Sequence, residues 1–267
     1  MQTFPIFIIN LPTAIERRAA IVQQMNSLGL QYEIVEGVFG NDSRVTARYD
    51  ENLSIKERGK PLTIGERGCA LAHALIYDRM LRENISVALI LEDDIVLEDD
   101  ILLRIESEIK KNRGRWGWLS FDYRYVGVKF LYHWLVATIK TVRQKPTFVF
   151  YAFAKMFYIP PLTLFEGFRN WLALTLPVFQ GAKGFYRPLF NAGAYLVTQD
   201  GARQLSVLTT PLHFTADELP NIARRRSGLK MLGYVPLCVR QNTDDFTTDA
   251  GLTNQEWERI FSSTENL

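Results

Sequence analysis

Hydrophobic positions in the first ninety residues follow two alternating periods. Short apolar runs at 4–11 (FPIFIINL) and 31–38 (QYEIVEGV) are typical of strands, whereas 14–29 and 63–82 carry apolar residues at helical spacing. Thr13 is the expected cap of the first helix, and Thr63 with Glu66 forms the capping-box pattern at the start of the second. The run VALIL at 87–91 contains no polar position, as in a strand covered on both faces of a parallel sheet. This order predicts an α/β fold with a parallel sheet.

Three acidic residues, Glu92, Asp93 and Asp94, follow the VALIL run directly. Ligands of parallel α/β sheets bind beyond the carboxyl ends of the strands, and we expect Asn10, Glu36 and this acidic cluster to meet there. Adjacent carboxylates repel one another, so either solvent or a bound cation must stabilise them. Hard oxygen ligands suit Mg²⁺ or Mn²⁺. The alternative is a solvated loop, although Asp99 and Asp100 already supply acids for the next helix start.

The amino-acid composition excludes only a few classes of protein. The 267 residues carry a formal net charge of +2, so an electrostatic signal must lie in local patches. Cys69 and Cys238 are the only cysteines, which excludes a disulfide framework and favours two free thiols in a reducing compartment. The first residues lack the basic start and long apolar run of a signal peptide, and no stretch reaches the ~18 apolar residues of a spanning helix. We therefore expect a cytoplasmic protein.

Several motifs together resemble glycosyltransferase family 25, the bacterial lipopolysaccharide glycosyltransferases related to collagen galactosyltransferases. The resemblance leaves out roughly residues 115 to 187. It rests on IINLPTAIERR (8–18), GERGCALAHALIY (65–77), LILEDDIVL (89–97), NAGAYLVTQDGARQL (191–205), TADEL (215–219) and VPLCVRQN (235–242). It implies a GT-A-like fold that binds a nucleotide sugar at a DxD-type motif and transfers the sugar to an acceptor hydroxyl.

The resemblance also implies roles within the acidic cluster. Asp94 would hold the divalent cation that bridges the donor's diphosphate, and Glu92 or Asp93 would reach the ribose or the donor sugar. This chain departs from a literal Asp-x-Asp because Glu92 stands first. A cation at this point agrees with the chemistry, since the nucleoside diphosphate leaving group needs its developing charge neutralised.

Other donor-site candidates each have a structural alternative. Arg17 could bind a phosphate bidentately, or it could belong to a solvated helix face. His73 lies on a helix with Glu66 and Tyr77 on the same side, where it could support the donor pocket or be a satisfied core histidine. Gln241, at the end of an expected strand, is a weaker candidate for a donor or metal contact.

Asp217 in the segment FTADEL is the expected catalytic residue. The family carries an acidic residue before a helix at about this position. A carboxylate that faces the acceptor is the natural general base of an inverting transfer. The alternative is an acid that caps a short helix, and we favour Asp217 over Glu218.

Residues 116–187 form the expected insertion, mainly helical and rich in aromatic residues. The stretch from 116 to 190 holds 21 of the chain's 33 aromatic residues, and from 125 to 190 its only acid among eight basic residues is Glu166. Such amphipathic segments suit an anchor at the membrane interface, although a core or a dimer interface would also use them. The residues expected at lipid are Phe130, Trp134, Phe153, Phe157 and Trp171, with Lys140, Arg143 and Lys145 at the headgroups.

The sequence as a whole predicts a single α/β, GT-A-like glycosyltransferase domain with this insertion. It would move a hexose, in the first place galactose from UDP-galactose, onto a lipopolysaccharide or lipooligosaccharide hydroxyl at the cytoplasmic face of the inner membrane. Nucleic acid is not an expected partner, because no binding signature accompanies the basic residues. The alternatives are a catalytically inactive, membrane-associated scaffold and a divalent-metal nucleotidyltransferase or phosphotransferase.

Overall fold

The computed structural model describes residues 3–122, 165, 168–169, 172–173, 176–185 and 189–242. The chain divides into two compact units, one of residues 1–123 with 181–251 and the other of residues 124–180 with 252–267. The first unit holds the sheet and the predicted site residues. In the second unit, the described part includes the 3₁₀ turn η2 (Pro177–Phe179). The aromatic and basic residues expected to contact lipid lie outside the described residues.

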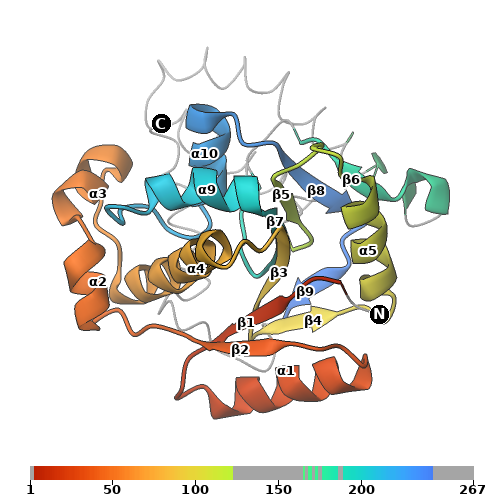
Figure 1. Ribbon diagram of the computed structural model, residues 1–267, viewed down its shortest axis with the longest axis horizontal. Coiled ribbons are helices and arrows are strands. Elements are labelled where there is room, and N and C mark those ends of the chain that lie inside the picture. Colours follow the sequence, from red (N-terminus) through yellow and green to blue (C-terminus); the bar gives the residue numbers. More distant parts are fainter. Residues whose placement is uncertain are drawn as a thin grey trace, which may run out of the picture. The chain divides into compact units, whose positions relative to one another are not determined.

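A seven-stranded sheet forms the centre of the first unit, and a two-stranded sheet packs beside it (Figure 1). Its strands, in spatial order, are β2 (Glu33–Glu36), β1 (Ile6–Asn10), β3 (Val87–Glu92), β7 (Ala194–Thr198), β5 (Trp118–Ser120), β8 (Met231–Val235) and β6 (Gly181–Lys183). The small antiparallel sheet pairs β4 (Ile95–Leu97) with β9 (Val239–Gln241).

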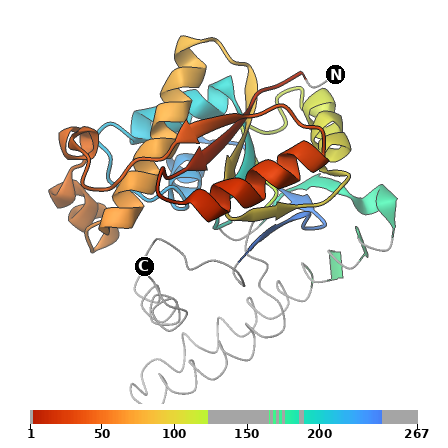
Figure 2. The ribbon, with the colours of Figure 1, turned by 90° about the horizontal axis from the view of Figure 1, so that it is seen from below.

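Helices cover both faces of the large sheet. The helices described in this unit are α1 (Ile15–Ser27), α2 (Ser43–Arg48), α3 (Glu51–Arg58), α4 (Ile64–Arg82), α5 (Ile101–Lys111), α9 (Gln199–Leu208) and α10 (Leu219–Ser227). Ile21 of α1 and Ile105 of α5 join the same buried cluster as Leu89 of β3, so these two helices share one face. Figure 2 shows α1 lying across that side of the sheet. On the other face α4 packs against α9, and Tyr77 of α4 reaches Tyr195 of β7.

The predicted α/β fold is confirmed, but the sheet is mixed rather than parallel. β1, β2 and β3 run parallel, as do β5 and β8, whereas β7 is antiparallel to both of its neighbours and β6 is antiparallel to β8. An apolar run indicates burial on both faces, yet it does not encode the direction of the neighbouring strand. The antiparallel direction of β7 could therefore not be predicted from the pattern of apolar residues.

Two local predictions also need correction, and one is confirmed. The N-cap of α1 is Ala14 rather than Thr13, and the side chain of Asn10 binds the Ala14 carbonyl instead. The strands β5 and β6 fall inside the range 116–187, so the ends of the predicted insertion belong to the sheet. The predicted Thr63–Glu66 capping box is present at the start of α4.

Among the described residues, no helix is both long and apolar enough to cross a bilayer.

Candidate functional site

The carboxyl ends of β1, β2 and β3 bring three groups of predicted site residues to one edge of the sheet. Asn10 pairs with Glu36 in the β1–β2 register, and its side-chain amide donates a 2.6 Å hydrogen bond to Asp93. Asn10 is buried, whereas Glu36 is exposed at the end of its strand. The prediction that Asn10, Glu36 and the acidic cluster meet at this edge is confirmed.

The three consecutive carboxylates point in different directions, because β3 ends at Glu92 and the chain turns at Asp93 and Asp94. Glu92 turns toward α4, where it meets His73. Asp93 turns toward α1, where Arg17 lies 3.2 Å from its Oδ1 and Asn10 binds its Oδ2. Asp94 remains at the tip of the strand. Like charges that would otherwise crowd one point are thereby separated.

Asp93 and Arg17 form a largely buried ion pair next to Asn10, with side-chain exposures of 9% and 12%. Arg18 points to solvent, so the preference for Arg17 as the residue that faces the cluster agrees with the structure. In this arrangement the Arg17–Asp93 ion pair already connects the end of β3 to α1. Their predicted role in donor binding stays a prediction, which the pair could fulfil through the outer atoms of the guanidinium.

Glu92 ends a chain of hydrogen bonds that begins deep in the core. Tyr77 and Tyr195 share a 2.8 Å bond between their hydroxyls, Tyr195 lies 2.6 Å from Nδ1 of His73, and Nε2 of His73 lies 3.2 Å from Glu92 Oε1. Burial is the largest single influence on the pKa of Glu92 and raises it, but the hydrogen bond and electrostatic interaction with His73, the hydrogen bond from Cys69 and the charge of Arg17 together hold that pKa below its ordinary value. His73 is fully buried, and both its ring nitrogens are engaged. It therefore acts here as a positioning residue for an ionised Glu92.

Asp94 has the properties of a cation ligand. Its Oδ1 is buried and has no hydrogen-bond partner within the described part of the chain, while Oδ2 accepts a long 3.4 Å bond from Gln241 of β9. Burial, followed by the charges of Glu92 and Asp93, raises the pKa of Asp94 to about 7. A carboxylate oxygen buried without a partner is costly unless something else binds it. Carboxylate and amide oxygens are the ligands that Mg²⁺ and Mn²⁺ prefer, so these residues fit such an ion.

Asp122 was missed by the sequence reasoning and belongs to the same edge. It follows β5 by two residues, its Oδ1 accepts a 3.0 Å hydrogen bond from Asn191, and its Oδ2 is buried with no partner among the residues that the structure describes. Burial, opposed by the Asn191 bond and aided by the charges of Glu92, Asp217 and Asp94, raises the pKa of Asp122 well above its ordinary value. The sequence signal that could have revealed Asp122 is an acidic residue at the end of a strand, which is also the signal that marked Glu92.

Gly193 makes room for the Asp122 carboxylate. The strand registers place it between Glu92 and Asp122, since the Glu92 amide donates to the Gly193 carbonyl and the Phe121 amide donates to the Ala194 carbonyl. A Cβ on Gly193 would stand 2.1 Å from Oδ2 of Asp122. The Asp122 side chain therefore leans over Gly193, and two carboxylates flank a strand position that has no side chain.

Gly193→Ala should lower the free energy of unfolding by about 1–3 kcal/mol, the usual cost of overpacking a filled site. Asp122 cannot easily swing away, because it is 3% exposed and held by Asn191. Urea unfolding measures the change. Gly184→Ala is the matched control, since its new Cβ meets nothing within 4 Å. A Gly193→Ala protein as stable as this control would show that Asp122 does not occupy the space above residue 193.

Asp217 lies in the turn that precedes α10 and is half-buried. The reciprocal cap of this turn is made by Thr215 and Glu218, whose amides and side-chain oxygens bond each other at 3.1 and 3.2 Å. Glu218 also forms a 2.6 Å ion pair with Arg58. Capping therefore accounts for the position of Glu218. The charge of Asp217 helps to raise the pKa values of Cys69 and Asp122, after the larger effect of their burial, so Asp217 lies within electrostatic range of these two side chains.

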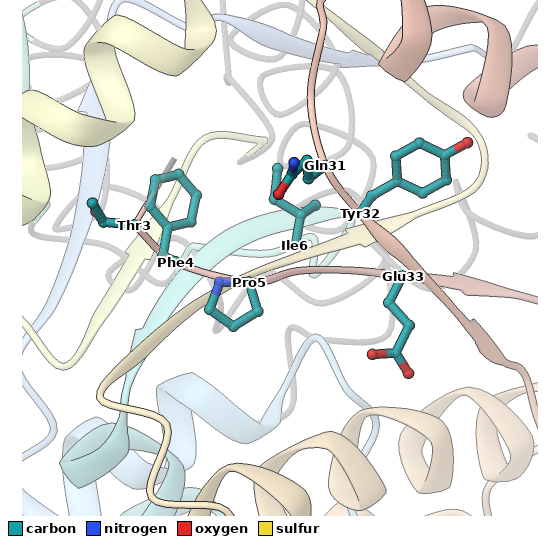
Figure 3. Close-up of a pocket in the computed structure, with 7 residues that line it drawn as sticks. All are labelled: Thr3, Phe4, Pro5, Ile6, Gln31, Tyr32 and Glu33. Atoms are coloured by element: carbon teal, nitrogen blue, oxygen red, sulfur yellow. The ribbon is translucent and has the colours of Figure 1, made fainter. Parts of the chain in front are cut away.

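Two cavities lie away from this cluster. One, of about 370 Å³, is found where β1 and β2 begin, at the opposite end of the strands from Asn10 and Glu36 (Figure 3). It is lined by Thr3, Phe4, Pro5, Ile6, Gln31, Tyr32 and Glu33. The other, of about 440 Å³, includes Ser86 and Lys230, which precede β3 and β8. Neither contains the carboxylates at the carboxyl edge, and we place the functional site at that edge on chemical grounds.

Comparisons with known proteins agree on one family. A family model described as glycosyltransferase family 25, lipopolysaccharide biosynthesis protein, matches residues 3–220. A glycosyltransferase 25 family member from Anopheles gambiae is 33% identical over 130 residues, which is 46% of this chain and 22% of that protein. Procollagen galactosyltransferase 1-B from Xenopus laevis is 32% identical over 135 residues, which is 46% of this chain and 21% of that protein.

These matches cover only about a fifth of the relatives' length. A solved structure, of a glycosyltransferase involved in glycosylation of the major capsid of PBCV-1, aligns with 98% of this chain and 100% of its own at 10% identity and a TM-score of 0.42. The family model extends from the start of β1 to the start of α10 and so includes the whole acidic edge of the sheet. On this match, the chain belongs to glycosyltransferase family 25.

Proposed function

We propose that this protein transfers a hexose from a UDP-sugar to an acceptor hydroxyl, with a divalent cation, Mn²⁺ or Mg²⁺, held by Asp94. The observation that carries the proposal is the buried Asp94 Oδ1, which lacks a partner among the described residues and stands at the tip of β3. Membership of glycosyltransferase family 25 supports the reaction class. An ion at this point would neutralise the charge that develops on the diphosphate as it leaves.

The chain's own residues would bind and orient the donor. Gln241 holds the Asp94 carboxylate from β9, and His73 holds an ionised Glu92 on the other side of the strand. An ionised Glu92 is a hydrogen-bond acceptor for hydroxyls of the ribose or of the sugar. Arg17 stabilises Asp93 and keeps the strand end in place. Because these partners fix their carboxylates before any ligand arrives, little reorganisation is needed on binding.

Asp217 would act as the general base of a single displacement. It takes the proton of the acceptor hydroxyl, the acceptor oxygen bonds to the anomeric carbon, and the bond from that carbon to the diphosphate oxygen breaks. Attack from the face opposite the diphosphate inverts the configuration. The charge of Asp217 acts on Asp122 at the carboxyl edge of the sheet, and Thr215 and Glu218 form the cap of the turn that carries it, which supports this role.

Galactose is the donor sugar that we propose, and a lipid-linked saccharide is the acceptor. The name of the Xenopus relative supports galactose, and the family's description as a lipopolysaccharide biosynthesis protein supports the acceptor. A panel of UDP-sugars, assayed for UDP release with Mn²⁺ and either a lipid-linked or a free oligosaccharide acceptor, tests both. We expect release with UDP-galactose. Failure of every UDP-sugar to bind would favour an inactive scaffold, and incorporation of the nucleotide into product would favour a nucleotidyltransferase.

The proposed acceptor has a lipid tail, so we also propose that the protein binds the cytoplasmic membrane surface. The support is compositional, namely the aromatic and basic residues between 125 and 190. We expect the protein to float with anionic liposomes at low salt and to dissociate at high salt, since headgroup attraction is screened. A protein that stays unbound to anionic and neutral liposomes at every salt concentration would contradict the proposal.

A further inference from the structure

Three potential metal ligands converge next to the proposed cation site and have no role in it. Cys69 and His73 are one helical turn apart on α4, and Glu92 at the end of β3 meets both. One ligand atom from each lies within 4.8 Å of the other two. Residues spaced i and i+4 on a helix face the same side, which is the arrangement of helical zinc-binding pairs. We call these three residues the thiol cluster.

Two of the three distances within the thiol cluster match those of a zinc site. Zinc bonds nitrogen and oxygen at about 2.0–2.2 Å and sulfur at about 2.3 Å, so tetrahedral neighbours stand about 3.4 Å apart for N and O and about 3.6 Å apart for S and O. The Nε2 atom of His73 is 3.2 Å from Glu92 Oε1, and the Sγ atom of Cys69 is 3.6 Å from the same oxygen. Both distances would need to change by only a few tenths of an ångström.

The surroundings of the thiol cluster also suit a metal. A histidine ligand usually has its second nitrogen held by a hydrogen bond, and Nδ1 of His73 is held by Tyr195. Tyr195 is itself fixed by Tyr77 and by stacking on Trp118 at 3.6 Å between ring centroids. Cys69 and Glu92 are half-buried rather than enclosed, which leaves a way in for an ion.

We propose that the thiol cluster binds a thiophilic divalent cation, with Zn²⁺ as the best fit, and that the bound ion withdraws Glu92 from the donor site. A thiolate and an imidazole select zinc, whereas the oxygen ligands at Asp94 select Mg²⁺ or Mn²⁺. On binding, the Cys69 S–H bond breaks and its proton passes to solvent, while the His73 ring proton moves from Nε2 to Nδ1, where the Tyr195 hydroxyl accepts its hydrogen bond, so that the sulfur and Nε2 both bond to zinc. With three protein ligands, the fourth position stays open to water.

Under this proposal, the end of β3 carries two neighbouring metal sites that prefer different metals. Glu92 belongs to the thiol cluster and Asp94 to the proposed catalytic ion, and one residue separates them. Zinc bound to Glu92 removes an acceptor that the donor's hydroxyls would use, so Zn²⁺ should inhibit transfer even with Mn²⁺ in excess. This inhibition rests on the proposed function, whereas metal binding itself does not.

Cobalt(II) absorption tests the binding without a sugar donor. Bound to a thiolate, Co²⁺ gives a charge-transfer band in the near ultraviolet, which added Zn²⁺ should abolish by displacement. The full-length protein in excess Mg²⁺, which occupies the oxygen site, should show the band. Cys238→Ala is the matched control, since Cys238 is a free, buried thiol outside the cluster, and it should keep the band.

Cys69→Ala should lose the band and weaken Zn²⁺ binding by more than the roughly 10–100-fold that loss of a merely supporting partner costs. If Cys69→Ala does not fold, Cys69→Ser replaces it and should also lose the band. A wild-type protein without the band, or a folded Cys69 variant that keeps it, would overturn the proposal. Failure of the UDP-sugar assay would leave the cobalt result unaffected, so the two proposals fail separately.

Discussion

Asp94→Asn should abolish Mn²⁺-dependent UDP binding and reduce transfer by at least the roughly 10²–10³-fold that loss of one preorganised electrostatic group costs. An amide can still accept the bond from Gln241, but it brings no negative charge to the cation. UDP titration with and without Mn²⁺ measures the change. The control is Asp99→Asn, which removes an exposed acid five positions away. Full activity in Asp94→Asn would contradict the assignment of Asp94.

The same substitution should stabilise the metal-free protein. The pKa of Asp94 is raised from 3.8 to about 7, so between these values the folded state holds a proton that the unfolded state has released. The contribution of Asp94 to the free energy of unfolding is therefore fully present below pH 3.8, and it is lost as the pH rises through about 7. We expect Asp94→Asn to raise the Tm at pH 8 by roughly a few degrees and to lose this advantage in acid. Mn²⁺ should raise the Tm of the wild type and not that of the variant.

Asp217→Asn should lower turnover by about 10²–10⁴-fold while UDP-sugar affinity stays near normal. The amide cannot take the proton of the acceptor hydroxyl, whereas the donor's contacts with Asp94 and Glu92 are unaffected. Steady-state kinetics combined with equilibrium binding of the UDP-sugar separate these two effects. If Asp217→Asn lost donor binding instead, Asp217 would belong to the donor site and another residue would have to be the base.

Glu218→Gln is the comparison variant for Asp217→Asn. It weakens the 2.6 Å ion pair with Arg58 and the cap with Thr215, so the melting temperature should fall while turnover is kept. The two adjacent substitutions are thus expected to separate chemistry from stability. A large loss of turnover in Glu218→Gln at a temperature where it is fully folded would reverse the two roles.

The position of the site could be predicted from the sequence, and the direction of its side chains could not. Strand-like runs that end at Asn10, Glu36 and Glu92 predicted a shared edge, and the structure confirms it. Which of three adjacent carboxylates would stay available depended on what the flanking helices supply. Arg17 of α1 binds Asp93, His73 of α4 binds Glu92, and Asp94 is left at the tip. Such pairings join residues far apart in the chain, and local patterns do not encode them.

Asp122 shows where the sequence pattern carried too little information. The strand before it, β5, has only three residues and lies in the part of the chain that the family motifs do not cover. Its partner Gly193 lies inside the motif NAGAYLVTQDGARQL, but that motif does not indicate which side chain packs over the glycine. The capping box of α4 is the opposite case. It depends on residues three positions apart, and it could therefore be predicted from the sequence alone.

A crystal structure with Mn²⁺ and UDP, using the anomalous signal of manganese, tests the central claim most directly. The proposed function predicts an anomalous peak about 2.0–2.2 Å from a carboxylate oxygen of Asp94 and in contact with the UDP diphosphate. Gln241 should stay next to this carboxylate. UDP bound with its diphosphate away from the carboxyl end of β3, or manganese bound without Asp94, would contradict it.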